Sequence, residues 1–599
     1  MNSPDTAVLE RPTATPETTA VRQWLDAFEA ALNGGNAAAI AKLFTPDSHW
    51  RDLLAFTWDL TPHLGVDKIA ASLAKAQPAT RARAFNISLE RTPPRRVRRH
   101  AVDVIEAIIE FETAVGTGSG ILRLLASNPT EHAAGQPARA WVLLTTLEVL
   151  RGYEEKTGKL QPKGEPYSRD FRGGNWLDQR NKAQAYADRE PAVLVVGGGQ
   201  AGLSIAARLG QLDVDTLVVD KHERVGDNWR KRYHSLALHN QIQANHLPYM
   251  LFPPTWPKYI PKDMLANWFE AYAWSMQINF WTGTEFTGGT YDEAKKCWHV
   301  TVRRADGSER TLHPRHVIFA NGVSGIPKMP SLPGLEDFKG DVMHSHSFST
   351  GARWAGKKAL VLGTGNSAHD VAQDLHSHGA HATLIQRGST TVVSVDPSAR
   401  LNYALYDEGR SLDDTDLIAT ASTYPLTVKA YQLAVERMVE FDKDLIAALK
   451  AKGFKYDLGE DLTGHQMKYR RRGGGYYLDV GCSGLIIKGE VGLLQWDNIE
   501  CFVANGVKLK DGSLIEAELL VLATGYHTQR ELVRRLLGEE VAARVGDIWG
   551  FDATGEMANM WKRTAQPGLW FMAGSLAQCR IYSKYLALQI KALETGLLK

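Results

Sequence analysis

The chain has 599 residues, of which 44% are hydrophobic and 23% are charged, as in a folded protein and not in a disordered or fibrous one. Its 69 Lys and Arg nearly balance 67 Asp and Glu, and the net charge of +2 predicts neither a nucleic-acid partner nor a charged membrane surface. No apolar run is long enough to cross a bilayer and the four cysteines form no CxxC pair. We therefore expect a cytoplasmic protein without transmembrane segment, thiol–disulfide active site or Cys-rich zinc site.

The N-terminal part predicts a flexible tail, residues 1–17, and a first module over residues 18–152. Val21, Leu25, Phe28 and Leu32 have helical spacing, and Asn36 is placed to cap a second helix. Apolar stretches at 102–111, 121–125 and 141–150 read as strands. Helices followed by strands predict an α+β unit with the helices packed on a curved antiparallel sheet.

This element order, with the sequence LFTPD and the WRD that follows it at residues 50–52, resembles the NTF2-like (SnoaL-like) cone fold. In such a cone Asp47, His49 and Asp52 could act as acid and base, but capping and turn formation are the favoured explanation. The module could instead dimerise or dock, since cones of this kind often pair through their sheets. The arginines at 95–99 and 470–472 are expected on a solvated or interdomain surface.

A polar linker, residues 153–190, leads to the first of two glycine-rich turns. The apolar run at 192–196 predicts a buried parallel strand, and GGGQAG at 197–202 follows it and opens a helix. Gly197 allows the tight turn, Gly199 lets the backbone approach a pyrophosphate, and Gly202 lets helix and strand pack closely. The next strand ends at Asp220, where an acid can bind ribose hydroxyls. This unit alone suits either FAD or NAD.

The second glycine turn has the sequence GTGNSA at residues 363–368, between the apolar strand 359–362 and a helix. Its following strand ends at Arg387 with no acid, and an arginine can hold a 2′-phosphate through paired hydrogen bonds. The cofactor predicted here is NADPH and not NADH, unless Arg387 is a plain surface residue. Two such units in one chain indicate a flavin that accepts hydride from NADPH.

From residue 192 onward the sequence resembles the class B flavin monooxygenases. Residues 338–348 follow that family's pattern F-x-G-x-x-x-H-x-x-x-[FY], and the segments 236–239, 258–262 and 478–481 resemble its YUCCA-like branch. Baeyer–Villiger members carry Trp where Phe348 stands, which disfavours ketone oxidation. The resemblance implies that FAD, reduced by NADPH, reacts with O₂ to a C4a-(hydro)peroxyflavin that oxygenates a small organic substrate of the amine, sulfide or oxo-acid type.

The resemblance also implies the site residues. His239 and Asn240 are the catalytic candidates near the flavin, although His239 could be an ordinary core histidine. No metal is expected, because the histidines show no metal-ligand spacing. The cofactor-binding candidates are Gly197, Gly199, Gly202, Asp220, Asn228, Trp229, Gly363, Gly365, Asn366, Ser367, Arg387, His344, Thr524 and Gly525.

The predicted fold class is therefore α/β, with two Rossmann-type dinucleotide-binding domains preceded by the cone module. FAD would be bound by residues 191–350 and 506–599, and NADPH by residues 351–505. A homodimer is expected. An NADPH oxidase that releases H₂O₂, or a Baeyer–Villiger enzyme, remains an alternative activity.

Overall fold

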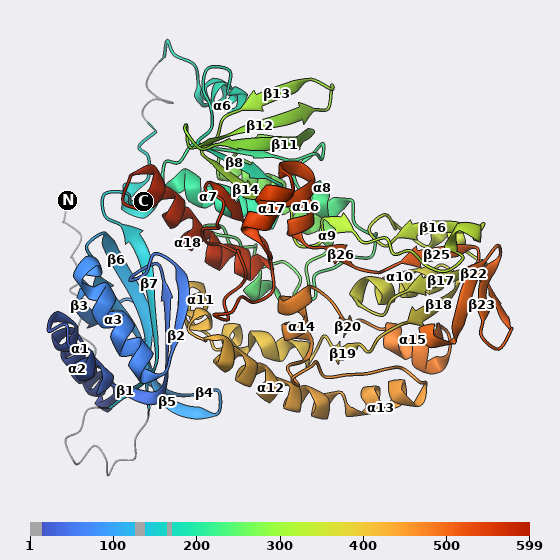
Figure 1. The fold of residues 1–599 in the computed structure, drawn as a ribbon, viewed down its shortest axis with the longest axis horizontal. Helices are drawn as coiled ribbons and strands as arrows, with labels where there is room; N and C mark the ends of the chain where they lie inside the picture. Colours follow the sequence, from blue (N-terminus) through green and yellow to red (C-terminus); the bar gives the residue numbers. More distant parts are fainter. Residues whose placement is uncertain (1–14, 126–137, 165–170, 599) are drawn as a thin grey trace.

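The computed structural model describes residues 15–125, 138–164 and 171–598. Most of the predicted tail, residues 1–17, lies outside these ranges, and the first helix begins at Pro16. Figure 1 shows the N-terminal module at one end, the first dinucleotide-binding sheet in the middle and the second at the far end. In the described ranges no helix is both long and apolar enough to cross a membrane.

The N-terminal module has three helices against one sheet. Its helices are α1 (Pro16–Asn33), α2 (Ala37–Ala41) and α3 (Val66–Thr80), and its strands are β1 (Phe44–Leu53), β2 (Leu60–Leu64), β3 (Arg83–Ile87), β4 (Arg95–Arg99), β5 (Val102–Glu112), β6 (Gly116–Leu125) and β7 (Ala140–Leu150). Asn36 caps α2 as predicted, accepting from the N–H of Ala38 at 2.9 Å. Trp24 donates to the Leu43 carbonyl at 2.9 Å, which fixes α1 to the start of β1.

The sheet runs β2-β1-β7-β6-β5-β3, with β4 beside β5. The expectation of a wholly antiparallel sheet was wrong, because β1 pairs with β7 in parallel. Strands β5, β6 and β7 follow one another as antiparallel neighbours. Strands β1 and β7 are far apart in the chain, so no hairpin turn joins them and their pairing need not be antiparallel. Asp52 accepts hydrogen bonds from the N–H groups of Phe56 and Thr57, the turn role weighed for it above.

The predicted linker contains ordered structure, including η1 (Gly158–Leu160) and α6 (Trp176–Ala185). Tyr186, at the end of α6, is fully buried and its hydroxyl donates to Asp215 at 2.6 Å. The second half of this segment is therefore docked on the first dinucleotide-binding sheet.

The first dinucleotide-binding sheet is five-stranded and wholly parallel, in the order β10-β9-β8-β14-β27. Its strands are β8 (Val193–Val196), β9 (Thr216–Val219), β10 (Asn279–Trp281), β14 (His316–Phe319) and β27 (Leu569–Phe571), and its helices include α7 (Gln200–Gln211), α8 (Asp227–Arg230), α9 (Lys262–Ser275) and α18 (Leu576–Glu594). A three-stranded sheet of β11 (Thr284–Asp292), β12 (Cys297–Arg304) and β13 (Glu309–Leu312) flanks it, and α16 (Gln529–Leu537) and α17 (Glu539–Val545) follow near the C-terminus.

The second parallel sheet has the order β16-β25-β17-β18-β21. Its strands are β16 (Asp341–His344), β17 (Lys358–Leu362), β18 (His381–Gln386), β21 (Gly492–Gln495) and β25 (Leu519–Leu522), with helices α10 (Asn366–Ser377) and α15 (Cys482–Lys488). The short sheets beside it are β15 (Ile326–Pro327) with β26 (Tyr526–His527), β19 (Thr391–Ser394) with β20 (Tyr476–Asp479), and β22 (Ile499–Val503), β23 (Gly506–Leu509) and β24 (Leu514–Glu516).

Sheet membership does not follow the predicted boundaries at residues 350 and 505. Strand β16 precedes the first boundary and β25 follows the second, yet both belong to the second sheet. Short apolar strands carry no sequence mark of the sheet they join, so the expected boundaries fell inside this sheet on both sides.

A helical segment inserted in the second domain returns toward the N-terminal module (Figure 1). It consists of η5 (Ala399–Asp407), α11 (Leu412–Thr420), α12 (Tyr424–Phe441), α13 (Lys443–Ala451) and α14 (Gly464–Arg472). One hydrophobic core joins the N-terminal module to the first dinucleotide-binding sheet and α18, whereas the second sheet has separate cores.

Candidate active site

One cavity of about 1680 Å³ opens between the two parallel sheets, and both glycine turns line it. The volume exceeds the ~300–1,000 Å³ typical of a site for one small molecule. The described part contains no group of three or more His, Cys, Asp or Glu side chains able to hold a metal ion. The cavity therefore suits one or more extended organic groups.

The first glycine turn brings bare backbone to the cavity. A Cβ on Gly202 would lie 1.9 Å from the Gly197 carbonyl oxygen, so only glycine allows α7 to start so close to β8. Gly199 is the N-cap of α7 and offers no side-chain cap, and the first turn of the helix carries no acid. The free N–H groups and the positive end of the helix dipole can thus receive a phosphate.

Asp220 stands at the end of β9 and faces the same cavity. It accepts hydrogen bonds from the Gly198 N–H at 2.7 Å and from the His222 N–H and Nδ1 at 2.9 and 2.7 Å. Burial opposes ionisation, but the hydrogen bonds from His222 and Gly198 hold the pKa of Asp220 below its usual range. An ionised carboxylate beside the turn can accept hydrogen bonds from ribose hydroxyls.

Asn228 and Trp229 of α8 complete this side of the cavity. The Asn228 amide lies where a Cβ of Gly199 would come within 2.8 Å of it. The Trp229 ring donates from Nε1 to Gln200 at 3.3 Å, and Gln200 donates to the Gly574 carbonyl at 3.3 Å. Gln200 was not predicted as a site residue, although it fills a variable position of the glycine motif itself.

The second glycine turn repeats this geometry. A Cβ on Gly363 would come within 2.6 Å of the Ala523 carbonyl oxygen, and α10 also begins without a side-chain cap, after Gly365. Ser367 lines the cavity, but the Asn366 side chain is already engaged, because its Oδ1 accepts from the Leu478 N–H at 2.8 Å. Arg387 lines the cavity, is exposed, and makes no hydrogen bond or ion pair with the described residues.

His344 is not among the residues that line the cavity, although Ser345 and His346 beside it are. Its Nδ1 accepts from the His346 N–H at 3.0 Å, so the proton is on Nε2, which donates to the Gly525 carbonyl at 3.1 Å. Burial lowers the pKa of His344, so the ring is neutral near pH 7. Gly525 and Thr524 line the cavity, and the Thr524 hydroxyl donates to the Lys328 carbonyl at 2.6 Å.

His239 and Asn240 also line the cavity. Burial lowers the pKa of His239, and the nearby Asp370 of α10 opposes that shift. Burial also raises the pKa of Asp370, which accepts a hydrogen bond from the Tyr233 hydroxyl. Tyr233 and Asp370 thus join the segment before His239 to the helix of the second glycine turn.

The sequence is similar to that of known proteins over most of the part that forms this cavity. The family described as pyridine nucleotide-disulphide oxidoreductase matches residues 194–458. The indole-3-pyruvate monooxygenase YUCCA1 of Oryza sativa subsp. japonica is 30% identical over 339 residues, which are 56% of this chain and 77% of that protein. The probable indole-3-pyruvate monooxygenase YUCCA4 of Arabidopsis thaliana is 28% identical over 338 residues, 56% of this chain and 75% of that protein.

The chain belongs to the class B flavin monooxygenases. Among solved structures, cyclohexanone monooxygenase bound to epsilon-caprolactone has a similar fold, with a TM-score of 0.50 and 18% identity over 68% of this chain and 88% of that one. The protein is accordingly an oxidoreductase that uses FAD and NADPH. The N-terminal module lies outside the matched family region.

Several residues of the monooxygenase cavity escaped the sequence analysis because they come from the helical insertion. Tyr403 of η5 and His465, Gln466 and Tyr469 of α14 all line the cavity. Burial raises the pKa of Tyr403 to about 12, although its contacts with Gln466 and Asn240 oppose this. Only the tertiary fold brings these residues to Asn240, and no local motif marks them.

The close packing at Gly202 predicts that a larger residue there weakens FAD binding. Gly202→Ala would place a methyl group against the Gly197 carbonyl at a cost of about 1–3 kcal/mol, so the purified monooxygenase should lose most of its FAD, measured as flavin released per protein. Gly210→Ala is the matched control on the same helix, because a Cβ there meets nothing within 4 Å. Equal FAD content in both variants would contradict the role given to Gly202.

Proposed function

We propose that this monooxygenase oxygenates a small organic acid, with FAD held at the first glycine turn and NADPH at the second. The support is geometric: both helix N-termini open into one cavity, with an ionised carboxylate at the first turn and, at the second, an arginine that has no partner in the described part of the chain. When bound, NADPH would supply hydride and FAD would supply the means to reduce O₂, so that one oxygen atom enters the substrate and the other leaves as water.

The chain's own residues would bind and orient the two cofactors and shield them from water. Gly197, Gly199 and Gly202 bring the backbone to the FAD pyrophosphate, and Asp220 accepts from its ribose. Asn228 and Trp229 lie along the same cofactor. On the other side Gly363, Gly365 and Ser367 approach the NADPH pyrophosphate, and Arg387 donates to the 2′-phosphate. Asn366 acts by holding β20 beside the turn.

His239 and Asn240 are proposed to face the reacting part of the flavin. A neutral His239 can donate one hydrogen bond and accept another without bringing a positive charge into the cavity. Tyr233 and Asp370 fix the approach of this segment to α10. His344 and Thr524 are proposed to fix the chain segments that connect the two domains, through their hydrogen bonds to the Gly525 and Lys328 carbonyls.

The acid class of substrate is supported by Arg470 of α14. Its guanidinium lies 5.6 Å from the ring centre of Tyr431, with Tyr403 and Tyr582 nearby, and no described carboxylate lies within the 4 Å of an ion pair. Arg470 is partly buried, and its neighbours Gln466 and Tyr469 line the cavity. A largely desolvated cation is normally paired, so an anionic group of the substrate is the natural partner. Indole-3-pyruvate, named for the plant relatives, carries such a carboxylate.

The N-terminal module is proposed to be an NTF2-like cone, on the support of three helices packed against one seven-stranded sheet. The domains would then be residues 18–152 for the cone, about 191–325 with 529–599 for FAD, and about 326–528 for NADPH. Because the sheet face that bears Arg51 and Glu148 contacts the chain's own C-terminal helix, the proposed homodimer would use another surface.

The alternative activity is an NADPH oxidase that releases H₂O₂. Substrate-dependent NADPH consumption with labelled oxygen from O₂ in the product supports oxygenation. Stoichiometric H₂O₂ with no labelled product would support the oxidase.

The assignment of NADPH rests on Arg387. Replacing it with Ala should raise the KM for NADPH ~10–100-fold, the effect of losing about 1.5–3 kcal/mol of charged hydrogen bonding. The KM for NADH should change little, because NADH has no 2′-phosphate. Steady-state NAD(P)H oxidation measures both constants, and Arg353→Ala, on the surface against Trp354, is the control. Equal increases for the two coenzymes would remove Arg387 from the site.

The acid substrate rests on Arg470. With indole-3-pyruvate as the probe, Arg470→Gln should raise its KM at least ~10-fold while the KM for NADPH stays constant, since a charged pair is lost only toward the substrate. Arg437→Gln, an exposed residue of α12, is the control. If the wild-type enzyme instead prefers a neutral sulfide such as thioanisole over indole-3-pyruvate, the acid assignment is wrong.

A further inference from the structure

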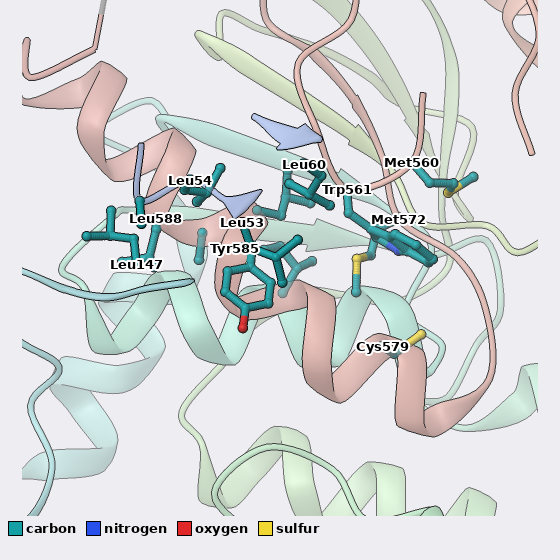
Figure 2. Packing of buried hydrophobic residues seen from close by; sticks show 14 of the residues in the cluster. Leu53, Leu54, Leu60, Leu147, Met560, Trp561, Met572, Cys579, Tyr585 and Leu588 are labelled. Atoms are coloured by element: carbon teal, nitrogen blue, oxygen red, sulfur yellow. The ribbon is translucent and has the colours of Figure 1, made fainter. Parts of the chain in front are cut away.

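The N-terminal module shares its core with the catalytic part of the chain. Figure 2 shows Leu53, Leu60 and Leu147 of the module beside Tyr585 and Leu588 of α18. All of these side chains are almost fully buried. The contact is therefore a continuous hydrophobic interior and not a loose surface between two domains.

One arginine of the module crosses this contact and holds three catalytic-side segments. Arg51 of β1 donates to both carboxylate oxygens of Glu556 at 2.7 Å, to the Thr420 carbonyl at 2.8 Å, and to the Tyr582 hydroxyl at 3.2 Å. The Arg51 and Glu556 side chains are each only 7% exposed. Thr420 ends α11 and Tyr582 lies on α18, so Arg51 ties these two helices together from the module side.

A second arginine ties the same two helices on the cavity side. Arg580 of α18 binds both carboxylate oxygens of Asp416 of α11 at 2.7 Å. It also donates to the carbonyls of Ala244 and His246 at 2.9 and 2.6 Å. The Tyr406 hydroxyl of η5 donates to Asp416 at 2.7 Å. This second arginine therefore holds both η5 and the segment that follows Asn240.

That segment reaches the cavity directly. Asn245 is 1% exposed and its side-chain amide donates to the Asn240 carbonyl at 3.0 Å. Tyr403 of η5 contacts the Asn240 side chain from the other direction. Asn240, Asn245 and Tyr403 all line the cavity. The position of the candidate catalytic segment thus depends on the distance between α11 and α18.

We propose that Arg51 of the N-terminal module is a positioning residue for the catalytic segment 239–246 and for Tyr403. By fixing α11 to α18, Arg51 keeps the ion pair between Arg580 and Asp416 intact. That pair holds the segment after Asn240 through the Ala244 and His246 carbonyls, and it holds η5 through Tyr406. The module then supports the part of the cavity where O₂ reacts and keeps water out of it. Excluding water limits the release of H₂O₂ in place of oxygen transfer to the substrate. The proposal uses the family assignment but not the acid substrate.

The test is hydrogen–deuterium exchange of the FAD-loaded full chain. Arg51→Met alone would leave Glu556 buried without a partner, so R51M/E556L, which removes both charges, is the principal variant. Arg51→Lys keeps the positive charge but makes fewer hydrogen bonds, so it should keep part of the protection from exchange that R51M/E556L loses. Arg83→Met removes an exposed ion pair with Glu112 in the same module and is the control.

In R51M/E556L, peptides covering 239–246 and 399–407 should exchange at least ~10-fold faster, while peptides of α7 and α10 keep their protection. NADPH oxidation without added substrate should release more H₂O₂ per unit time, with the KM for NADPH unchanged. If faster exchange is confined to residues 44–53, 412–420 and 576–586, Arg51 only anchors the module and the proposal is wrong. An unchanged rate of H₂O₂ release would equally overturn the bracing role.

Discussion

The close approach of two glycine turns to one cavity is the constraint on which the rest of the structure depends. At Gly202 and Gly363 a single added carbon would collide with backbone, so helix and strand meet there only without a side chain. Both helices that start at these turns leave their first N–H groups uncapped. Two positive helix ends facing one space define a site for two phosphate-bearing molecules, and the other functional residues are placed relative to them.

Charge is distributed around this cavity in a consistent way. Asp220 remains ionised at the first turn because three N–H groups point at it, and Arg387 has no partner among the described residues at the second. Burial lowers the pKa values of His239, which lines the cavity, and of His344, which does not, so both rings are neutral. Lys468 and Arg472 of α14 also line the cavity, and they are paired with Asp457 and Glu460.

The sequence predicted what depends on short segments. Both glycine turns, the acid after β9 and the arginine after β18 were found because each needs only a strand, a turn and a helix in order. The parallel pairing of β1 with β7 was missed, and so was the membership of β16 and β25 in the second sheet, because both follow from long-range topology. Tyr403, Asp370 and Arg51 were missed for the same reason. Each acts through a partner more than a hundred residues away in the chain.

The proposed function requires FAD and NADPH to share this cavity closely enough for direct hydride transfer. The most direct measurement is anaerobic stopped-flow absorbance of the purified enzyme, mixed with NADPH or with NADPH deuterated at the transferred position. We expect a yellow protein whose visible flavin band bleaches on mixing, and bleaches more slowly with the deuterated coenzyme. A colourless protein that takes up no FAD, or a bound flavin that NADPH leaves oxidised, would contradict it.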